Sequence, residues 1–362
     1  MGNGQSSHYE PGRPLSIRAI VIGGVALAIV AVTAITMLLS FYGEGSRQDQ
    51  ARLEVVRTAG TLVVGTGGAF ALLLAARRQR STEQTLEHER EVAAVAAQDA
   101  AKQRITELSS RSIDQLGINQ APVRLGGLYA LERLAQDNVD QRQTTVNIFC
   151  AYLRMPFNPP IDLPEEASPE QLVYGNDQKY QELQVRLTAQ RILAAHLRPG
   201  KKDLFWSEID LDLTRAYLHD FDMSDTVIGK AEFSKAKFAG DTDFSQAAFM
   251  GGASFRNASF ADVSFWETGF MNFGDFKEVC FHGEAFFMEA KFYGIAVFRG
   301  AQFSSIGEFA AAKFSGDAEF FGARFLAAAR FDGVEFSEYV EFNETEFSEP
   351  SQTSSGDNAR SD

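Results

Sequence analysis

Large apolar residues recur at a fixed short interval through the C-terminal half of the chain. The intervals alternate between five and six residues, with a single lapse between Phe260 and Phe265. Leu213, Leu218, Met223 and Ile228 precede the run at a plain spacing of five. So strict a period predicts a repeat architecture. The run holds 22 phenylalanines, each a predicted core residue: Phe233, Phe238, Phe244, Phe249, Phe255, Phe260, Phe265, Phe270, Phe276, Phe281, Phe287, Phe292, Phe298, Phe303, Phe309, Phe314, Phe320, Phe325, Phe331, Phe336, Phe342 and Phe347.

The residue two positions before each phenylalanine is usually small, most often alanine, as at Ala231, Ala253 and Ala318. Positions i−2 and i point to the same side of an extended backbone, so each repeat offers one small and one large inward side chain. Outward positions are polar, as in FSGDAEF. Short strands joined by regular turns cannot bury such faces alone, and we expect them to coil into a solenoid with a phenylalanine core.

The alternating interval predicts two kinds of corner. If four faces close one coil, alternating intervals of five and six make each coil longer than a plain spacing of five would. The extra residue of each six-residue interval then falls at the same corners in every coil and widens them. Glycine often stands two positions after the phenylalanine in the long intervals, where we expect a permissive backbone: Gly240, Gly251, Gly283, Gly294 and Gly316.

Two apolar runs near the N-terminus predict a membrane hairpin over residues 17–77. Residues 19–42 and 58–76 carry no charged side chain, and runs of about 20 apolar residues match the thickness of a bilayer. Arg13 and Arg18 precede the first run, and Arg77, Arg78 and Arg80 follow the second. The positive-inside rule then predicts a multi-pass protein with both termini, including the tail at 1–16, in the cytoplasm.

Residues 78–200 predict a helical module between the hairpin and the repeats. Residues 78–116 lack glycine and proline and are typical of one long helix. Two further segments, VRLGGLYALERLAQD from Val123 and VRLTAQRILAAHLRPG from Val185, place apolar residues at helical spacing. A proline-rich loop is expected near 155–170. The repeats then occupy 201–349, and the polar segment 350–362 is expected to be a disordered tail.

Charge and chemistry narrow the possible functions. Residues 201–350 hold 13 basic and 26 acidic residues, which argues against binding of nucleic acid and leaves imitation of it open. We find no phosphate-binding loop, nucleophile elbow, metal-ligand spacing or His and carboxylate pair, so we expect no enzyme activity, no cofactor and no metal. Cys150 and Cys280 are expected to be buried free thiols.

The repeats resemble the pentapeptide-repeat family, through LDLTRAYLHDFDMSD and the alternating phenylalanines that follow. The resemblance implies an α + β chain that ends in a right-handed quadrilateral β-helix. The preceding helical stretches, among them QTTVNIFCAYLRMPFNPP, resemble a bacterial membrane-anchored subgroup with two N-terminal transmembrane helices. This resemblance implies a location in the bacterial inner membrane. Family members that mimic DNA and bind a type II topoisomerase make that role the alternative here.

Our leading interpretation is a non-enzymatic scaffold, anchored in the lipid bilayer, whose acidic rod presents itself to an unknown cytoplasmic protein. Nothing in the sequence supports a homo-oligomer, although one is compatible with it. Trp266 follows one core phenylalanine directly and Phe286 precedes another, so both should face outward on adjacent coils. Exposed paired aromatic side chains predict an interaction patch at Trp266 and Phe286, whereas cover by a corner or a helix would make them structural.

Overall fold

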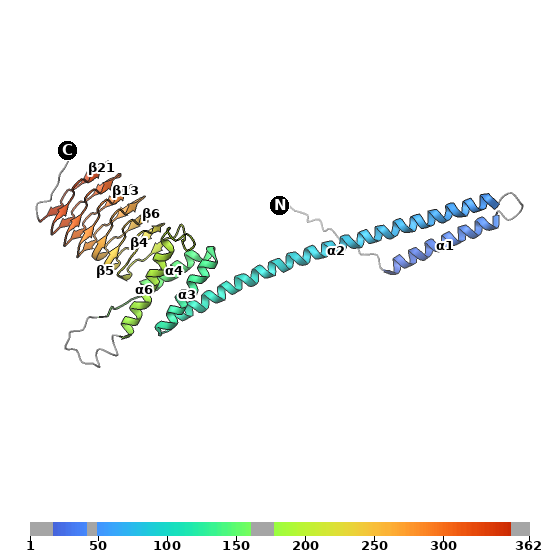
Figure 1. Ribbon diagram of the computed structural model, residues 1–362, viewed down its shortest axis with the longest axis horizontal. Coiled ribbons are helices and arrows are strands. Elements are labelled where there is room, and N and C mark those ends of the chain that lie inside the picture. Colours follow the sequence, from blue (N-terminus) through green and yellow to red (C-terminus); the bar gives the residue numbers. More distant parts are fainter. Residues whose placement is uncertain (1–16, 42–48, 161–176, 349–362) are drawn as a thin grey trace, which may run out of the picture. The chain divides into compact units, whose positions relative to one another are not determined.

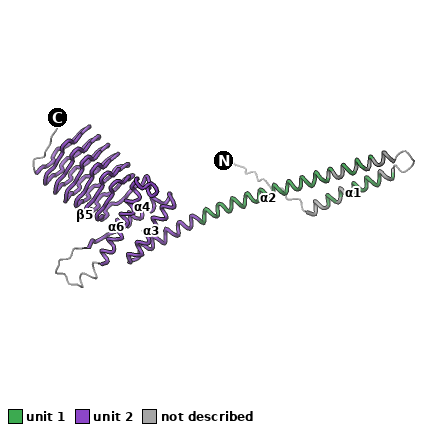
Figure 2. The backbone as a smooth tube through the Cα atoms, viewed as in Figure 1, with its two compact units in different colours: residues 1–100 green, residues 101–362 purple. Residues whose placement is uncertain are grey.

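The computed structural model describes residues 17–41, 49–160 and 177–348 (Figure 1). The chain divides into two compact units, residues 1–100 and 101–362 (Figure 2). The predicted tails at 1–16 and 350–362 lie outside the described residues, as does most of the proline-rich segment.

Unit 1 holds α1 (Ile17–Phe41) and the first part of α2 (Asp49–Leu116). The second apolar run and the charged segment after it, which we expected to be separate elements, form the single 68-residue helix α2. Across the described residues, no helix combines the length and the apolarity expected of a membrane span. The predicted pair of spans is therefore not confirmed.

Unit 2 begins with the end of α2 and continues through α3 (Ala121–Asp137), the short helix η1 (Val139–Gln141), α4 (Arg142–Arg154) and α6 (Asp177–Leu197). Proline in the first turn of α3 suits a helix start, because its missing N–H has no intrahelical partner there. Helix α6 ends just before Pro199 and Gly200. The helices bury one apolar face, which includes Leu131, Phe149 and Leu193, in the same core as the repeats.

A solenoid of short parallel strands follows (Figure 1). Its strands form three sheets, and the largest covers two faces because β5 and β8 run through the corner between them. The strands are β1 (Leu211–Asp212), β2 (Tyr217–His219), β3 (Val227–Ile228), β4 (Ala231–Glu232), β5 (Lys237–Asp243), β6 (Ala248–Phe249), β7 (Ala253–Ser254), β8 (Ser259–Ser264), β9 (Gly269–Phe270), β10 (Gly274–Asp275), β11 (Cys280–Phe281), β12 (Ala285–Phe286), β13 (Lys291–Phe292), β14 (Ala296–Val297), β15 (Gln302–Phe303), β16 (Gly307–Glu308), β17 (Lys313–Phe314), β18 (Ala318–Glu319), β19 (Arg324–Phe325), β20 (Ala329–Arg330), β21 (Glu335–Phe336), β22 (Val340–Glu341) and β23 (Glu346–Phe347).

Strand pairing reproduces the coil lengths that the spacing predicts. Leu211 pairs with Ala231, across a coil in which every interval is five. Ala296 pairs with Ala318, across a longer coil in which the intervals alternate. Ser259 pairs with Cys280 across a coil of intermediate length, because this coil contains the short interval between Phe260 and Phe265. The lapse therefore shortens one coil and leaves the register of the later coils intact.

Stacked phenylalanine rings fill the interior. The ring of Phe276 stacks on Phe255 at 5.0 Å and on Phe298 at 4.8 Å, nearly parallel to each. Toward the next face it meets Phe287 edge-on, at an interplanar angle of 86°. Parallel stacking along the rod and edge contacts across it are both favourable geometries for aromatic pairs. The core is a solid column with an alanine or another small residue beside each ring.

The corners differ from the expectation about glycine. Positive φ angles recur at the tight corners, mostly at residues with side chains, such as Lys235 (61°) and Glu289 (55°). Of the five wide-corner glycines, only Gly240 has a positive φ. The others are required by close approach of the preceding coil: a Cβ on Gly294 would lie 1.5 Å from the backbone oxygen of Asn272. Glycine there provides space and not backbone freedom.

Side chains from the helices close the first coil. The amide of Gln143 on α4 donates to the carbonyl of Asp210 and accepts from its N–H, both at 2.9 Å. Gln190 on α6 does the same with His219, at 2.8 and 3.3 Å. Each glutamine takes the place of a missing strand at an edge that would otherwise expose unpaired backbone groups.

The opposite end of the solenoid is less covered. Phe342 and Phe347 keep their register and stack on Phe320 and Phe325, yet both are exposed, at 37% and 39%. Their outer ring faces are open because no further described coil follows. The predicted core ladder therefore holds its spacing to the end, whereas its burial weakens over the last coil.

Candidate functional site

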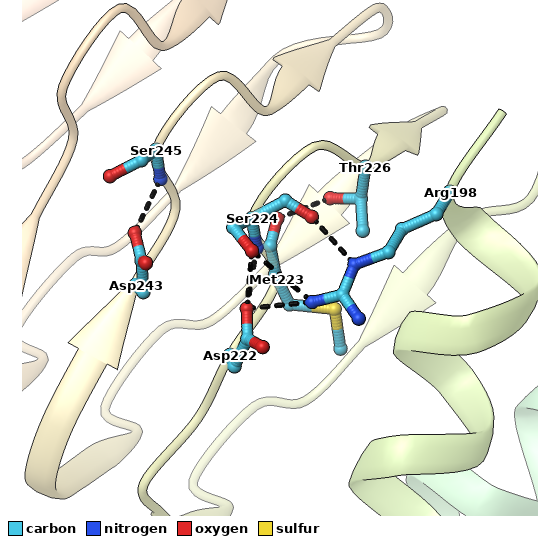
Figure 3. A network of polar contacts seen from close by, with 7 residues as sticks. All are labelled: Arg198, Asp222, Met223, Ser224, Thr226, Asp243 and Ser245. Carbon is cyan, nitrogen blue, oxygen red and sulfur yellow. Dashed lines mark hydrogen bonds and ion pairs between the residues drawn. The ribbon is translucent and has the colours of Figure 1, made fainter. Parts of the chain in front are cut away.

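The outward residues on either side of each core residue form columns along the solenoid. In the early coils a carboxylate stands before the core residue and a serine or threonine after it. Asp222 accepts from the backbone N–H of Ser224 at 2.9 Å and from its hydroxyl at 2.7 Å, and Asp243 accepts from the N–H of Ser245 (Figure 3). These bonds orient the carboxylates and consume part of their capacity to bind anything else.

Arg198, just beyond α6, joins the helices to this column. Its Nε donates to the carbonyl of Ser224 at 2.8 Å, and its terminal nitrogen donates to Asp222 at 2.7 Å (Figure 3). Burial by itself would raise the pKa of Asp222, but hydrogen bonds from Ser224 and Arg198 outweigh it and hold the pKa below its usual value. Both residues line a cleft of about 510 Å³ between α6 and the first coils. Since Arg198 and Asp222 are already bonded to one another there, the cleft is best explained as a structural junction.

A second polar cluster lies among the helices, around Glu182. This carboxylate pairs with Arg186 at 2.9 Å and with Arg124 at 3.2 Å, and it accepts from the hydroxyl of Tyr152 at 2.9 Å. Arg186 is almost fully buried and also donates to the carbonyls of Leu153 and Met155. Burial, with Glu182 beside it, raises the pKa of Tyr152. The cluster ties α3, α4 and α6 together, and breaking one of its partners would leave a buried charge uncompensated.

The predicted interaction patch lies on the outer surface, as placed by the register. Trp266 is exposed and Phe286 is half-buried. Phe286 pairs with Ser264, two residues before Trp266, so the two aromatic residues occupy neighbouring columns on adjacent coils. Beneath them, Phe265 and Phe287 stack at 4.8 Å. The side chain of Trp266 is 38% exposed, so it is not packed into a core.

Several exposed apolar residues lie at one corner of the solenoid, and the sequence analysis did not group them. This wide corner lies between β6 and β7, between β9 and β10 in the next coil, and between β13 and β14 in the third. Met250, Met271 and Tyr293 directly follow the core phenylalanine at the corner in these three coils, and Ile295 lies two residues beyond Tyr293. The signal was available in principle: in each long interval of this corner, the position after the phenylalanine could have been compared from coil to coil. The core ladder drew attention to inward positions instead.

The two cysteines differ from one another. Cys150 is buried, and burial raises the pKa of its thiol to about 12, so the thiol is unreactive at neutral pH. Cys280 is only half-buried, which corrects the expectation for it, because it occupies the outward position before Phe281. Among the described residues, no three His, Cys, Asp or Glu side chains lie close enough together to hold a metal ion.

Comparison with models of protein families gives a match within the solenoid. Residues 224–269 match the family described as pentapeptide repeats (9 copies). This match, together with the parallel β-solenoid, supports identification as a pentapeptide-repeat protein. The phenylalanine ladder continues beyond the matched segment to Phe347. A search of curated proteins found no significant match.

Proposed function

We propose that the chain is a non-enzymatic scaffold whose solenoid presents its outer faces to a protein partner. The observation that carries this proposal is the contrast between the two sides of the solenoid wall. The interior is a closed column of stacked rings, which leaves the outer surface for recognition. That surface exposes large apolar side chains, among them Trp266, Tyr293 and Ile295, which have no evident structural use there.

A DNA-mimicking role receives less support than a protein-scaffold role. Mimicry requires rows of free negative charge, and the outward carboxylates are partly neutralised. Among the described residues, five of them pair with arginine: Asp212 with Arg154, Asp222 with Arg198, Asp275 with Arg256, Glu308 with Arg330, and Glu346 with Arg324. Uncharged residues such as Ser254 and Phe286 also interrupt the columns. We therefore propose recognition by side-chain shape and apolar contact and not by an extended field of acid.

Membrane tethering through unit 1 forms part of the proposal. Its support is the uncharged sequence of residues 19–42 and the exposure of apolar side chains on both helices, including Ile29, Val32 and Leu72. The lack of a qualifying span among the described helices does not support it. Fractionation decides: the full chain should stay with membranes after carbonate extraction, and Ile29→Lys combined with Leu72→Lys should release it. Recovery of the unaltered chain in the soluble fraction would overturn tethering alone.

The scaffold proposal is tested by proximity labelling with the full chain in intact cells. A labelling enzyme fused to the C-terminus should mark a small, reproducible set of proteins. The labelling is compared with that of a double variant, Trp266→Ser with Tyr293→Ser, which alters two outward positions and should leave the core intact. We expect the double variant to lose at least one labelled protein while circular dichroism stays unchanged. Identical labelling by both forms would contradict recognition through these faces.

A further inference from the structure

One corner of the solenoid differs from the rest of its surface in both polarity and charge. It joins the face of β6, β9 and β13 to the face of β7, β10 and β14. Across these three coils, five apolar side chains point outward at or beside the corner. We call them the apolar centre: Met250, Met271, Phe273, Tyr293 and Ile295.

Register places these side chains next to one another. Phe249, Phe270 and Phe292 pair in successive coils, so the residues that follow them, Met250, Met271 and Tyr293, form one column. Gly274 pairs with Ala296, which puts Phe273 beside Ile295 in a second column. Adjacent coils lie about 4.8 Å apart, so side chains in each column are in van der Waals reach.

These side chains are exposed and yet held in place. Met250, Tyr293 and Ile295 are 54%, 51% and 48% exposed. The ring of Phe273 lies over Gly252, where an added Cβ would come within 2.6 Å of it. Because the ring of Phe273 packs on Gly252, its position is fixed before a partner binds. The side chain then loses little conformational freedom on binding, which lowers the entropic cost of forming an interface.

Cations border the apolar centre on both sides. Arg256, Lys277 and Arg299 form a column on the β7, β10 and β14 face, as the pairing of Ser254, Asp275 and Val297 requires. Lys291 lies on the other side of the apolar centre, on the face of β6, β9 and β13. We call these four residues the cationic rim. Residues 248–256, 269–277 and 291–299 hold four basic residues and one acidic residue, whereas 201–350 hold 13 and 26.

Two of these cations have no carboxylate partner within the described residues. The single carboxylate of the three rows, Asp275, is bonded to Arg256. The guanidinium of Arg299 stacks on the ring of Phe321 at 4.6 Å and forms no ion pair there, and Lys291 forms none either. Lys291 and Arg299 close the two ends of one row whose outward middle is Tyr293 and Ile295. Such a row matches a ligand with an apolar middle and negative ends.

We propose that the apolar centre and its cationic rim bind a protein segment with apolar residues flanked by carboxylates. This inference rests on the proposed scaffold function and specifies its partner. Met, Phe, Tyr and Arg are the residues enriched in protein interfaces, and a buried apolar centre with a charged rim is the usual anatomy of one. The backbone N–H groups of Met250, Met271 and Tyr293 already bond to the neighbouring coil, so recognition along this column depends on side chains. An anionic bilayer would also face the acidic remainder of the solenoid, which disfavours lipid.

The test is selection of short random peptides on phage against the purified full chain. Recovered peptides should combine aspartate or glutamate with apolar residues. Their affinity should fall about tenfold or more in Tyr293→Ser with Ile295→Ser and in Lys291→Glu with Arg299→Glu. Matched controls are Leu326→Ser, an exposed leucine at the other wide corner, and Lys237→Glu, an exposed lysine on another face; neither should change the affinity.

The outcomes separate this proposal from the one it rests on. Peptides that bind both double variants as tightly as the unaltered chain would overturn the assignment of this corner and leave the scaffold function standing. Recovery of no binding peptide, with no variant-sensitive proximity labelling, would overturn both. A blue shift of a Tyr293→Trp reporter with phosphatidylglycerol vesicles would assign the corner to lipid. Concentration-dependent dimerisation that Tyr293→Ser abolishes would assign it to a second copy, and either result would overturn the proposal.

Discussion

Truncation of one ring in the middle of the ladder should cost far more than truncation at its end. Phe276 is fully buried, stacks on one ring below and one above, and meets rings of the neighbouring faces edge-on. Replacing a buried phenylalanine by alanine typically costs about 3–5 kcal/mol, and the lost aromatic contacts place Phe276→Ala toward the upper part, at about 4 kcal/mol. Phe347 is 39% exposed and stacks on Phe325 alone. Phe347→Ala should cost only about 1–2 kcal/mol.

The assay is equilibrium unfolding in urea, followed by far-ultraviolet circular dichroism of the full chain. Fluorescence of Trp206, which is fully buried where the helices meet the solenoid, reports separately on the first coils. Phe276→Leu is the matched control, since leucine already serves as the core residue at Leu213 and Leu218, and it should cost less than about 1.5 kcal/mol.

Two results would refute the reasoning. Equal losses for Phe276→Ala and Phe347→Ala would show that burial and stacking do not set the stability of each coil. A cost below about 1 kcal/mol for Phe276→Ala would show that the column is not close-packed, because a well-packed site cannot lose a ring so cheaply. Separate transitions for the two halves of the solenoid in Phe276→Ala would instead agree with nearest-neighbour coupling in a repeat array.

Three further predictions follow from the same structure. Thr242→Val should raise the free energy of unfolding by about 1 kcal/mol in the urea assay, because the buried hydroxyl has no hydrogen-bond partner among the described residues; an equal or lower stability would contradict this. The pKa of Asp222 is held below its usual value, so its pairing with Arg198 stabilises the fold above about pH 4 and the benefit is lost as pH falls through the lowered pKa. Acid titration of Asp222→Asn should therefore show a smaller loss of stability on acidification than the unaltered chain, and matching curves would rule the pair out. Gly294→Ala should cost about 3 kcal/mol or more through its clash with the preceding coil, whereas Ala311→Gly, at φ 57°, should gain about 0.5–1 kcal/mol; the opposite order in thermal melts would overturn the account of the corners.

Periodicity made the solenoid predictable, because each repeat requires an inward side chain of the same size at the same position. The lapse between Phe260 and Phe265 falls in the coil that the strand pairing shows to be shortened. Spacing could not reveal why glycine stands at Gly294, since the reason is the approach of a backbone from another coil. Gln143 and Gln190 were equally invisible: a lone glutamine in a helix gives no sign that its amide will complete a strand edge far away in the chain.

Outward positions were harder to interpret than inward ones. Trp206 precedes the five-residue register, so the spacing assigned it no place, yet it is fully buried. Phe221 occupies the inward position two before Met223, where most repeats have a small residue, and it is fully buried as well. Trp266 and Phe286 attracted attention because they are aromatic and adjoin core positions. The sequence did not group Tyr293 with Ile295, because the significance of this pair depends on the cations at both ends of their row and on the neighbouring coils. Surface recognition combines residues across coils, and a single stretch of sequence does not display that combination.

The central claim is that the outer faces of the solenoid bind a protein, and site-specific photocrosslinking in living cells tests it most directly. A photoreactive amino acid would replace, in turn, Tyr293, Trp266, Leu326 and Lys237 in the full chain, so that distinct outer faces and corners are sampled. The account predicts a discrete crosslinked species of fixed mass from Tyr293 or Trp266 and none from the other two positions. Equal, diffuse crosslinking from all four positions, or none from any, would contradict it.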